Sequence, residues 1–173
     1  MLLQSTAANG LGELSERFDA MEEADWHIYQ VLTKRSSLLV RYLRRRYGKA
    51  KAPAHIWVGV SVEDTRNAVR LNHLKAAQVS VRFVSFEPLL GSVPPIDLRG
   101  IDWAIVGGES GPYAMPMAEE WALEICDQCK RDKIAFFFKQ WGGIQPKSGG
   151  RVFNGREWNE YPKSKEQRVC DAA

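Results

Sequence analysis

The sequence predicts an α/β fold in which parallel β/α units form a partial, open barrel of the TIM type, followed by a C-terminal β-hairpin. Stretches rich in β-branched and aromatic residues alternate along the chain with amphipathic stretches of helical period. Such alternation is typical of right-handed crossovers and a parallel sheet. Five strand-like stretches occur, and five parallel strands are too few to close a small barrel.

Length and composition indicate a single domain. The chain has 173 residues, a formal net charge of +3, 45% apolar residues and three cysteines. A chain of this length buries about 70% of its unfolded surface, which is sufficient for a core without disulfides or a structural metal. No apolar run of about 18 residues occurs, and residues 1–10 lack the pattern of a signal peptide. We therefore expect a cytoplasmic protein with reduced thiols and no membrane partner.

The N-terminal region, residues 1–24, is expected to form a helix. Its apolar residues recur at spacings of three and four: Leu11, Leu14, Phe18 and Met21. A strand is expected at 26–34, where WHIYQVLTK is rich in β-forming residues. Ser36 or Ser37 then caps a second helix, which ends near Gly48.

The same β/α unit repeats through the partial barrel, which is expected to span residues 26–141. The same patterns predict a strand at 56–63, a helix from Asp64 or Thr65, a strand at 81–87, a loop at 88–100, a strand at 101–107, a helix at 117–131 and a strand at 134–139. In the extension at 142–162, Asn154-Gly155 between β-prone arms predicts the hairpin. Residues 163–173 are expected to be a flexible tail.

All five strands end in ionisable or amide side chains, which is the most informative feature of the sequence. These ends are LTKR at 32–35, VSVED at 60–64, VSFEP at 84–88, VGGES at 106–110 and FKQWG at 138–142. In parallel α/β folds, the loops that leave the C-terminal strand ends build the binding site. We therefore expect the functional site at this edge of the sheet.

Three glutamates share one pattern at these strand ends. Glu63, Glu87 and Glu109 each follow a small residue by two positions, so all three are expected to face the barrel interior. Lys34 and Lys139 are expected beside them. Close carboxylates and ammonium groups shift one another's pKa values, which suits acid and base catalysis. The catalytic candidates are Glu63, Glu87, Lys34 and Lys139, and an internal salt-bridge network is the alternative interpretation.

The end of the fourth strand predicts a cofactor contact. Gly107 and Gly108 let the backbone approach a ligand, and free N–H groups in such a loop bind anions or carboxylates. Glu109 and Ser110 follow directly, and Trp141, just past the fifth strand, is a candidate for stacking on a ring. The glycine spacing differs from that of dinucleotide-binding and P-loop motifs, which disfavours those cofactors.

A basic segment makes the charge uneven along the chain. Residues 34–51 contain eight of the 24 basic residues and no acidic one, so the remainder carries 16 basic against 21 acidic residues. The candidate anion or nucleic-acid contacts are Arg35, Arg41, Arg44, Arg45 and Arg46. Such a patch attracts phosphate, and a solvated helix face is the alternative interpretation.

Cys126 and Cys129 form a CxxC pair that we interpret as core thiols. They fall in the C-terminal part of a predicted helix, whereas redox pairs owe their low pKa to a helix N-terminus. Cys170 and the three histidines lack metal-ligand spacing, so no metal site is assigned.

The motifs together resemble a known protein family. QVLTKR, WVGVSVED, VRFVSFEPLLG, DWAIVGGESG and FFFKQWG, followed by the hairpin around FNGREW, resemble a phage and prophage family of unknown function over residues 30–162. That family is similar to radical S-adenosylmethionine barrels. The cysteine-rich motif of the relatives does not occur ahead of Gln30. The resemblance therefore implies the C-terminal part of such a barrel, which binds S-adenosylmethionine but carries no iron-sulfur cluster of its own.

Three functions are compatible with these observations. The first is binding of S-adenosylmethionine or another small anionic or zwitterionic ligand at the C-terminal strand ends. The second is a non-enzymatic nucleic-acid or protein interaction module that uses the basic helix at 41–51. The third is an inactive remnant of the full-length family, and enzymatic activity stays open. In each case a homo-oligomer or a partner chain is expected to cover the open edge of the sheet.

Overall fold

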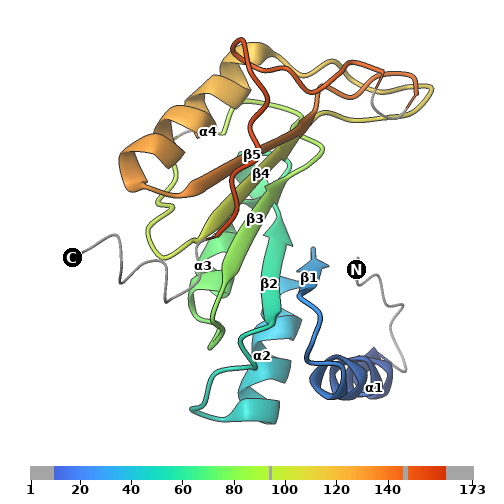
Figure 1. Ribbon diagram of the computed structural model, residues 1–173, viewed down its shortest axis with the longest axis vertical. Coiled ribbons are helices and arrows are strands. Elements are labelled where there is room, and N and C mark those ends of the chain that lie inside the picture. Colours follow the sequence, from blue (N-terminus) through green and yellow to red (C-terminus); the bar gives the residue numbers. More distant parts are fainter. Residues whose placement is uncertain (1–9, 94, 146–147, 163–173) are drawn as a thin grey trace.

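The computed structural model describes residues 10–93, 95–145 and 148–162 of an α/β protein (Figure 1). In chain order, its elements are α1 (Gly10–Glu23), β1 (Tyr29–Thr33), α2 (Ser36–Tyr47), β2 (Ile56–Ser61), the 3₁₀ turn η1 (Thr65–Asn67), α3 (Val69–Lys75), β3 (Arg82–Phe86), β4 (Trp103–Gly107), α4 (Glu119–Asp132) and β5 (Ala135–Gln140). None of the described helices is both long and apolar enough to cross a membrane. The tail expected at 163–173 lies outside the described residues.

The strands form one parallel sheet in the order β1-β2-β3-β4-β5. Each strand pairs with the next one along the chain, so every crossover runs in the same direction across the sheet. Right-handed crossovers then place α2, α3 and α4 on the same face. The sheet does not close on itself, which confirms the predicted partial, open barrel (Figure 1).

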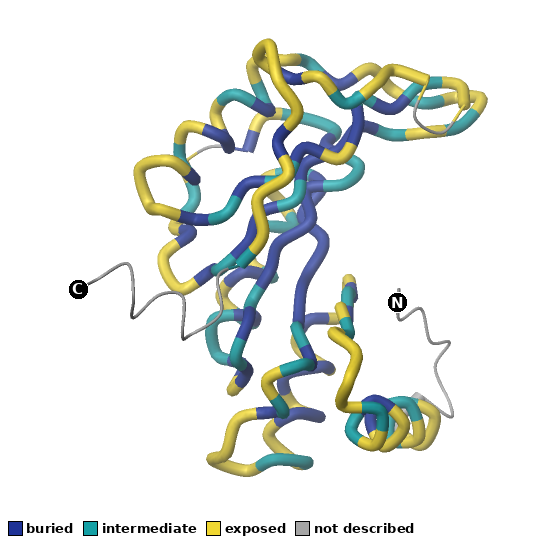
Figure 2. The backbone as a smooth tube through the Cα atoms, viewed as in Figure 1, coloured by how far each residue is buried: buried dark blue, intermediate teal, exposed yellow. Residues whose placement is uncertain are grey.

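The core lies between the sheet and these helices. The strands contribute alternate buried residues, which include Val31, Val58, Val60, Val84, Phe86, Ala104, Val106, Phe136 and Phe138. The helices contribute residues at helical spacing, which include Leu39, Leu43, Leu71, Leu74, Ile125 and Cys129. Figure 2 shows that burial is concentrated along the strands and on the helix sides next to them. The other set of strand side chains points to the opposite face and is available to form a site.

Two details of the first β/α unit differ from the sequence-based expectation. The strand begins at Tyr29 rather than at Trp26, because the chain turns after α1 and His27 N–H donates to the Ala24 carbonyl. The N-cap of α2 is Arg35, and neither Ser36 nor Ser37 caps the helix. Ser36 Oγ instead lies 2.9 Å from His73 Nδ1 and joins α2 to α3.

The predicted C-terminal hairpin is present and extends the sheet. Phe153 pairs with Arg156 in an antiparallel bridge, and Asn154 and Gly155 between them have positive φ values of 48° and 78°. Those dihedral angles suit the Asn-Gly pair. The chain then pairs antiparallel with β5 through Asn159, so the C-terminal extension covers the β5 edge of the sheet.

Candidate functional site

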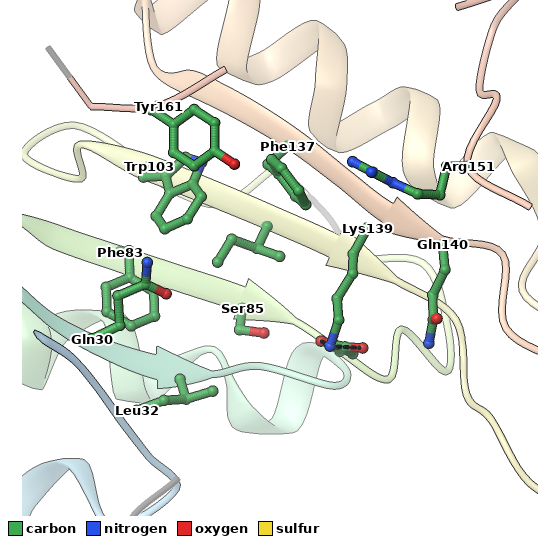
Figure 3. A pocket seen from close by; sticks show the side chains of 12 residues that line it. Gln30, Leu32, Phe83, Ser85, Trp103, Phe137, Lys139, Gln140, Arg151 and Tyr161 are labelled. Atoms are coloured by element: carbon green, nitrogen blue, oxygen red, sulfur yellow. Dashed lines mark hydrogen bonds and ion pairs between the residues drawn. The ribbon is translucent and has the colours of Figure 1, made fainter. Parts of the chain in front are cut away.

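A cavity of about 510 Å³ opens on the sheet face that the helices leave uncovered. Strands β1, β3, β4 and β5, with the chain directly after them and the C-terminal extension, provide its lining: Gln30, Leu32, Phe83, Ser85, Glu87, Trp103, Ile105, Phe137, Lys139, Gln140, Arg151 and Tyr161. Figure 3 shows the labelled strand side chains projecting from the sheet, with Arg151 and Tyr161 coming from the chain after β5. The cavity extends along the strands from Phe83 and Trp103, near the N-terminal strand ends, to Glu87, just past the C-terminal end of β3.

Aromatic rings form the floor of the cavity around Trp103. The Trp103 ring centroid lies 5.9 Å from Phe83, 5.9 Å from Phe137 and 6.1 Å from Trp57. Gly59 makes this arrangement possible, since a Cβ at that position would lie 2.3 Å from the Phe83 ring. A side chain on residue 59 would therefore push Phe83 out of the floor.

An ion pair between Glu87 and Lys139 forms the polar rim of the cavity. Lys139 Nζ lies 2.8 Å from Glu87 Oε1 and donates to Oε2 at 2.9 Å. The Glu87 side chain is 21% exposed and the Lys139 side chain is 50% exposed. Gly107 leaves space for this carboxylate, because a Cβ there would lie 3.3 Å from Glu87 Cδ. Beside an apolar floor, the rim thus offers a carboxylate that can pair with a cation and an ammonium group that can pair with an anion.

A second cation reaches the cavity from the C-terminal extension. The guanidinium carbon of Arg151 lies 5.2 Å from the centre of the Phe137 ring. Arg151 also donates to the side-chain oxygen of Asn159, which holds it beside the extension. The charged side chains that line the cavity are therefore Glu87, Lys139 and Arg151, and cations outnumber anions.

Glu63 belongs to a different ion cluster, above β1 and β2. Its carboxylate lies 2.5 Å from Lys34 Nζ and 2.8 Å from Arg70 Nη1. Arg70 also donates to the Ser61 carbonyl at 2.7 Å. Burial raises the pKa of the Glu63 carboxyl, but Lys34 and Arg70 outweigh burial, so the net pKa is lowered. Neither Glu63 nor Lys34 lines the cavity. These two catalytic candidates are instead part of an internal salt-bridge network with Arg70.

The candidate cofactor loop after β4 packs closely against the loop after β5. Gly108 N–H donates to the Gln140 carbonyl at 2.9 Å, and the Glu109 carboxylate accepts from Met115 N–H at 3.0 Å. Ser110 Oγ accepts from Gln140 Nε2 at 2.9 Å. Gln140 lines the cavity whereas Gly107, Gly108, Glu109 and Ser110 do not. These four residues therefore support the cavity through their neighbours.

Trp141 packs between β5 and the C-terminal extension. Its Nε1 donates to the Val152 carbonyl at 2.7 Å. Its ring centroid lies 4.9 Å from Phe138 and 5.9 Å from Phe153, and Phe138 is on the helix-facing side of the sheet. The tryptophan that lines the cavity is Trp103 instead.

The predicted anion contacts divide into one structural arginine and four exposed ones. Arg46 Nε donates to Glu22 at 2.8 Å, and Arg46 also pairs with Asp19 and donates to Tyr42 Oη. Its hydrogen bond to Glu22 lowers the pKa of that carboxyl. Arg46 thereby fastens α1 to α2. The exposed residues are Arg35, Arg41, Arg44 and Arg45, and the structure shows no ion pair for them within the described residues.

Cys126 and Cys129 are both fully buried in the core, as the sequence predicts. Burial raises the pKa of both thiols, which disfavours the reactive thiolate. Within the described ranges, no three histidine, cysteine, aspartate or glutamate side chains lie close enough to hold a metal ion.

Sequence reasoning missed four residues that define these sites. Trp103 carried a usable signal, because it lies four positions before Gly107 on the face expected to be interior. Arg70 lies in α3, seven residues after Glu63, and no sequence pattern singled it out. Arg151 and Tyr161 belong to the extension, whose lack of periodicity hides which side chains return to the sheet.

Comparison with known proteins adds a family without a known activity. A family model described as "Protein of unknown function (DUF5131)" matches residues 11–162. Neither the curated proteins nor the solved structures contain a significant match.

Proposed function

We propose that this chain, which belongs to the DUF5131 family of proteins of unknown function, binds a small zwitterionic or anionic molecule in the cavity on its open sheet face. The observation that carries the proposal is the Glu87–Lys139 ion pair at the rim of a 510 Å³ cavity. That volume is within the range of small-molecule sites, which combine an apolar lining with a few polar groups.

The rim chemistry matches a zwitterion in particular. The carboxylate of Glu87 accepts a hydrogen bond from the ammonium group of an amino acid, and Lys139 donates to the carboxylate of that amino acid. Arg151 adds a second cation at the same cavity, which favours a ligand with further negative charge or polar acceptors. Both members of the rim pair are partly exposed. A zwitterionic ligand can therefore separate Glu87 from Lys139 and pair with both, and neither charge is left buried without a partner.

S-adenosylmethionine is the first ligand to test, because the strand-end motifs resemble a phage and prophage family of unknown function that is itself similar to radical S-adenosylmethionine barrels. It combines an amino-acid zwitterion with an aromatic base, and the cavity offers an ion pair beside an aromatic floor. In this proposal the chain supplies binding and orientation through its own residues. Gly107 and Gly108 allow the loop after β4 to pack closely, and Glu109 and Ser110 stabilise that loop through their hydrogen bonds to Met115 and Gln140.

Isothermal titration calorimetry of the full chain tests this proposal with S-adenosylmethionine and with methionine as ligands. We expect Lys139→Met to weaken binding of either zwitterion by about tenfold or more, because a charge-assisted hydrogen bond is lost. Lys130→Met is the matched control, since Lys130 is 48% exposed and paired with Asp127 on α4, away from the cavity. Absence of heat and of thermal stabilisation with both ligands at millimolar concentration would contradict the proposal and favour an inactive remnant.

A second candidate function is binding of nucleic acid by α2. Arg41, Arg44 and Arg45 are exposed within a little more than one helical turn, and neighbours on a helix three and four residues apart share a surface. Stabilisation of the helix C-terminus by these cations is the competing explanation of their position.

Fluorescence anisotropy with a labelled single-stranded oligonucleotide separates these two explanations. If three arginines contact phosphates, affinity should fall roughly twentyfold between 50 and 200 mM salt. The Arg41, Arg44 and Arg45 to Gln triple variant should lose most of the binding. A control with the same loss of charge replaces Lys130, Arg131 and Lys133, all exposed at the end of α4. Salt-independent binding, or equal loss in both variants, would rule out a specific α2 interface.

A further inference from the structure

The indole N–H of Trp103 is a buried donor that lacks a hydrogen-bond acceptor in the described part of the chain. Trp103 is only 3% exposed, and it lines the cavity. A buried donor without an acceptor destabilises the folded protein, and buried indole N–H groups ordinarily have a partner. Trp141 shows the usual arrangement in the same protein, because its Nε1 donates to a carbonyl oxygen at 2.7 Å.

Tyr161 lies over this donor as a partial cover. Its ring centroid is 5.4 Å from that of Trp103, with an interplanar angle of 37°, and 5.7 Å from that of Phe137. Figure 3 shows the Tyr161 ring overlapping Trp103 at the edge of the cavity. Tyr161 is nevertheless 56% exposed, and its hydroxyl makes no hydrogen bond within the described residues. Little therefore holds the Tyr161 side chain in this position apart from ring contacts.

The chain directly before Tyr161 is hydrogen-bonded to β5. Glu160 N–H donates to the Phe136 carbonyl at 3.2 Å, and the Glu160 carboxylate accepts from Phe136 N–H at 2.9 Å. Phe138 N–H donates to the Trp158 carbonyl at 3.0 Å. A rotation of the Tyr161 side chain would uncover Trp103 without moving residues 158–160.

We infer that Trp103, Phe137 and Tyr161 form a subsite for a planar heteroaromatic ring that has a hydrogen-bond acceptor in its plane. The ring enters against Phe137, Tyr161 turns to stack on it, and Trp103 Nε1 donates to the acceptor. This inference rests on the proposed function and specifies the second half of the same ligand. A neutral ring nitrogen or carbonyl suits the donor, because the apolar side chains of Phe83 and Ile105 beside it penalise a buried anion.

The test uses the full chain with adenosine as the probe, because adenosine has a heteroaromatic ring and no amino-acid zwitterion. The six indole N–H signals are followed by ¹H–¹⁵N NMR, and the Trp103 signal is assigned with Trp103→Phe. We expect this signal to shift downfield in a saturable way as its proton acquires an acceptor. The signal of Trp26, which is 74% exposed, is the internal control and should not move.

Variants of Tyr161 test the stacking wall. Tyr161→Ala should weaken adenosine binding about tenfold, since base–aromatic stacking contributes about 1–3 kcal/mol. Tyr161→Phe should bind as the wild type does, because the hydroxyl makes no hydrogen bond there. Tyr113→Ala removes a tyrosine that is 96% exposed and serves as the matched control.

The possible outcomes distinguish this inference from the proposed function. If the Trp103 signal does not respond to adenosine while methionine still binds in a Lys139-dependent manner, the ring subsite is overturned and the rim site stands. Unchanged adenosine affinity in Tyr161→Ala overturns the role of Tyr161 as a wall. If neither adenosine nor methionine binds, both the inference and the proposed function fail.

Discussion

Replacing Gly108 with alanine is expected to lower the free energy of unfolding by about 3 kcal/mol, as forced overpacking does. A Cβ on residue 108 would lie 1.9 Å from the Trp141 carbonyl oxygen, and the obstacle is backbone rather than a flexible side chain. The two loops would have to separate and give up the hydrogen bond from Gly108 N–H to Gln140. Gly142 has the reciprocal constraint, with φ of +84° and the Glu109 carbonyl oxygen 2.0 Å from the position of its Cβ.

Urea unfolding followed by circular dichroism measures this effect. Gly91→Ala is the matched control, since nothing lies within 4 Å of a Cβ at that position, and it should change the free energy of unfolding by less than about 0.5 kcal/mol. A similarly small change for Gly108→Ala would show that the loops after β4 and β5 are not packed backbone to backbone. It would also restore the interpretation of this glycine as a direct ligand contact.

Replacing Glu63 with glutamine is expected to cost about 2 kcal/mol of stability at pH 7, because hydrogen bonds to a charged group are lost in a nearly buried position. The Glu63 side chain is 9% exposed and accepts from Arg70, which is itself 17% exposed. Lys34 is 54% exposed and can regain water, so Arg70 carries most of the loss. This places the effect above that of a surface ion pair.

The pH dependence of the same variant gives an independent check. The folded protein lowers the pKa of Glu63 below its ordinary value of 4.5, so the unfolded chain takes up a proton first as the pH falls. The stability that this carboxylate contributes is therefore complete above about pH 5. It declines below 4.5 as the pH approaches the lowered folded pKa.

Chemical unfolding of wild type and Glu63→Gln between pH 3 and 7 measures this difference. We expect the two stability curves to converge on the acid side. Asp127→Asn removes an exposed carboxylate from a pair with Lys130 and should leave the curve close to that of the wild type. A gap between wild type and Glu63→Gln that stays constant down to pH 3 would show that Glu63 is not stabilised in its charged form.

The sequence alone determined the order and type of the regular elements, and hence the open parallel sheet. Each strand and helix is signalled by local composition and period, and parallel β/α units have one preferred handedness. The hairpin at Asn154-Gly155 is equally local, because positive φ angles are a property of those residue types. The burial of Cys126 and Cys129 confirms their interpretation as core thiols within a predicted helix.

The grouping of the strand-end side chains was decided only by the tertiary structure. Glu63, Glu87 and Glu109 share one sequence pattern, but Arg70 draws the first aside, Lys139 holds the second at the cavity, and Met115 N–H engages the third. Trp103 rather than Trp141 lines the cavity, because Trp141 packs against Phe138 and Phe153 instead. Side-chain parity follows from the backbone of one strand, whereas an ion pair or a cavity depends on which distant segments meet. The C-terminal extension brings Arg151 and Tyr161 to the sheet through such long-range contacts, which no local period encodes.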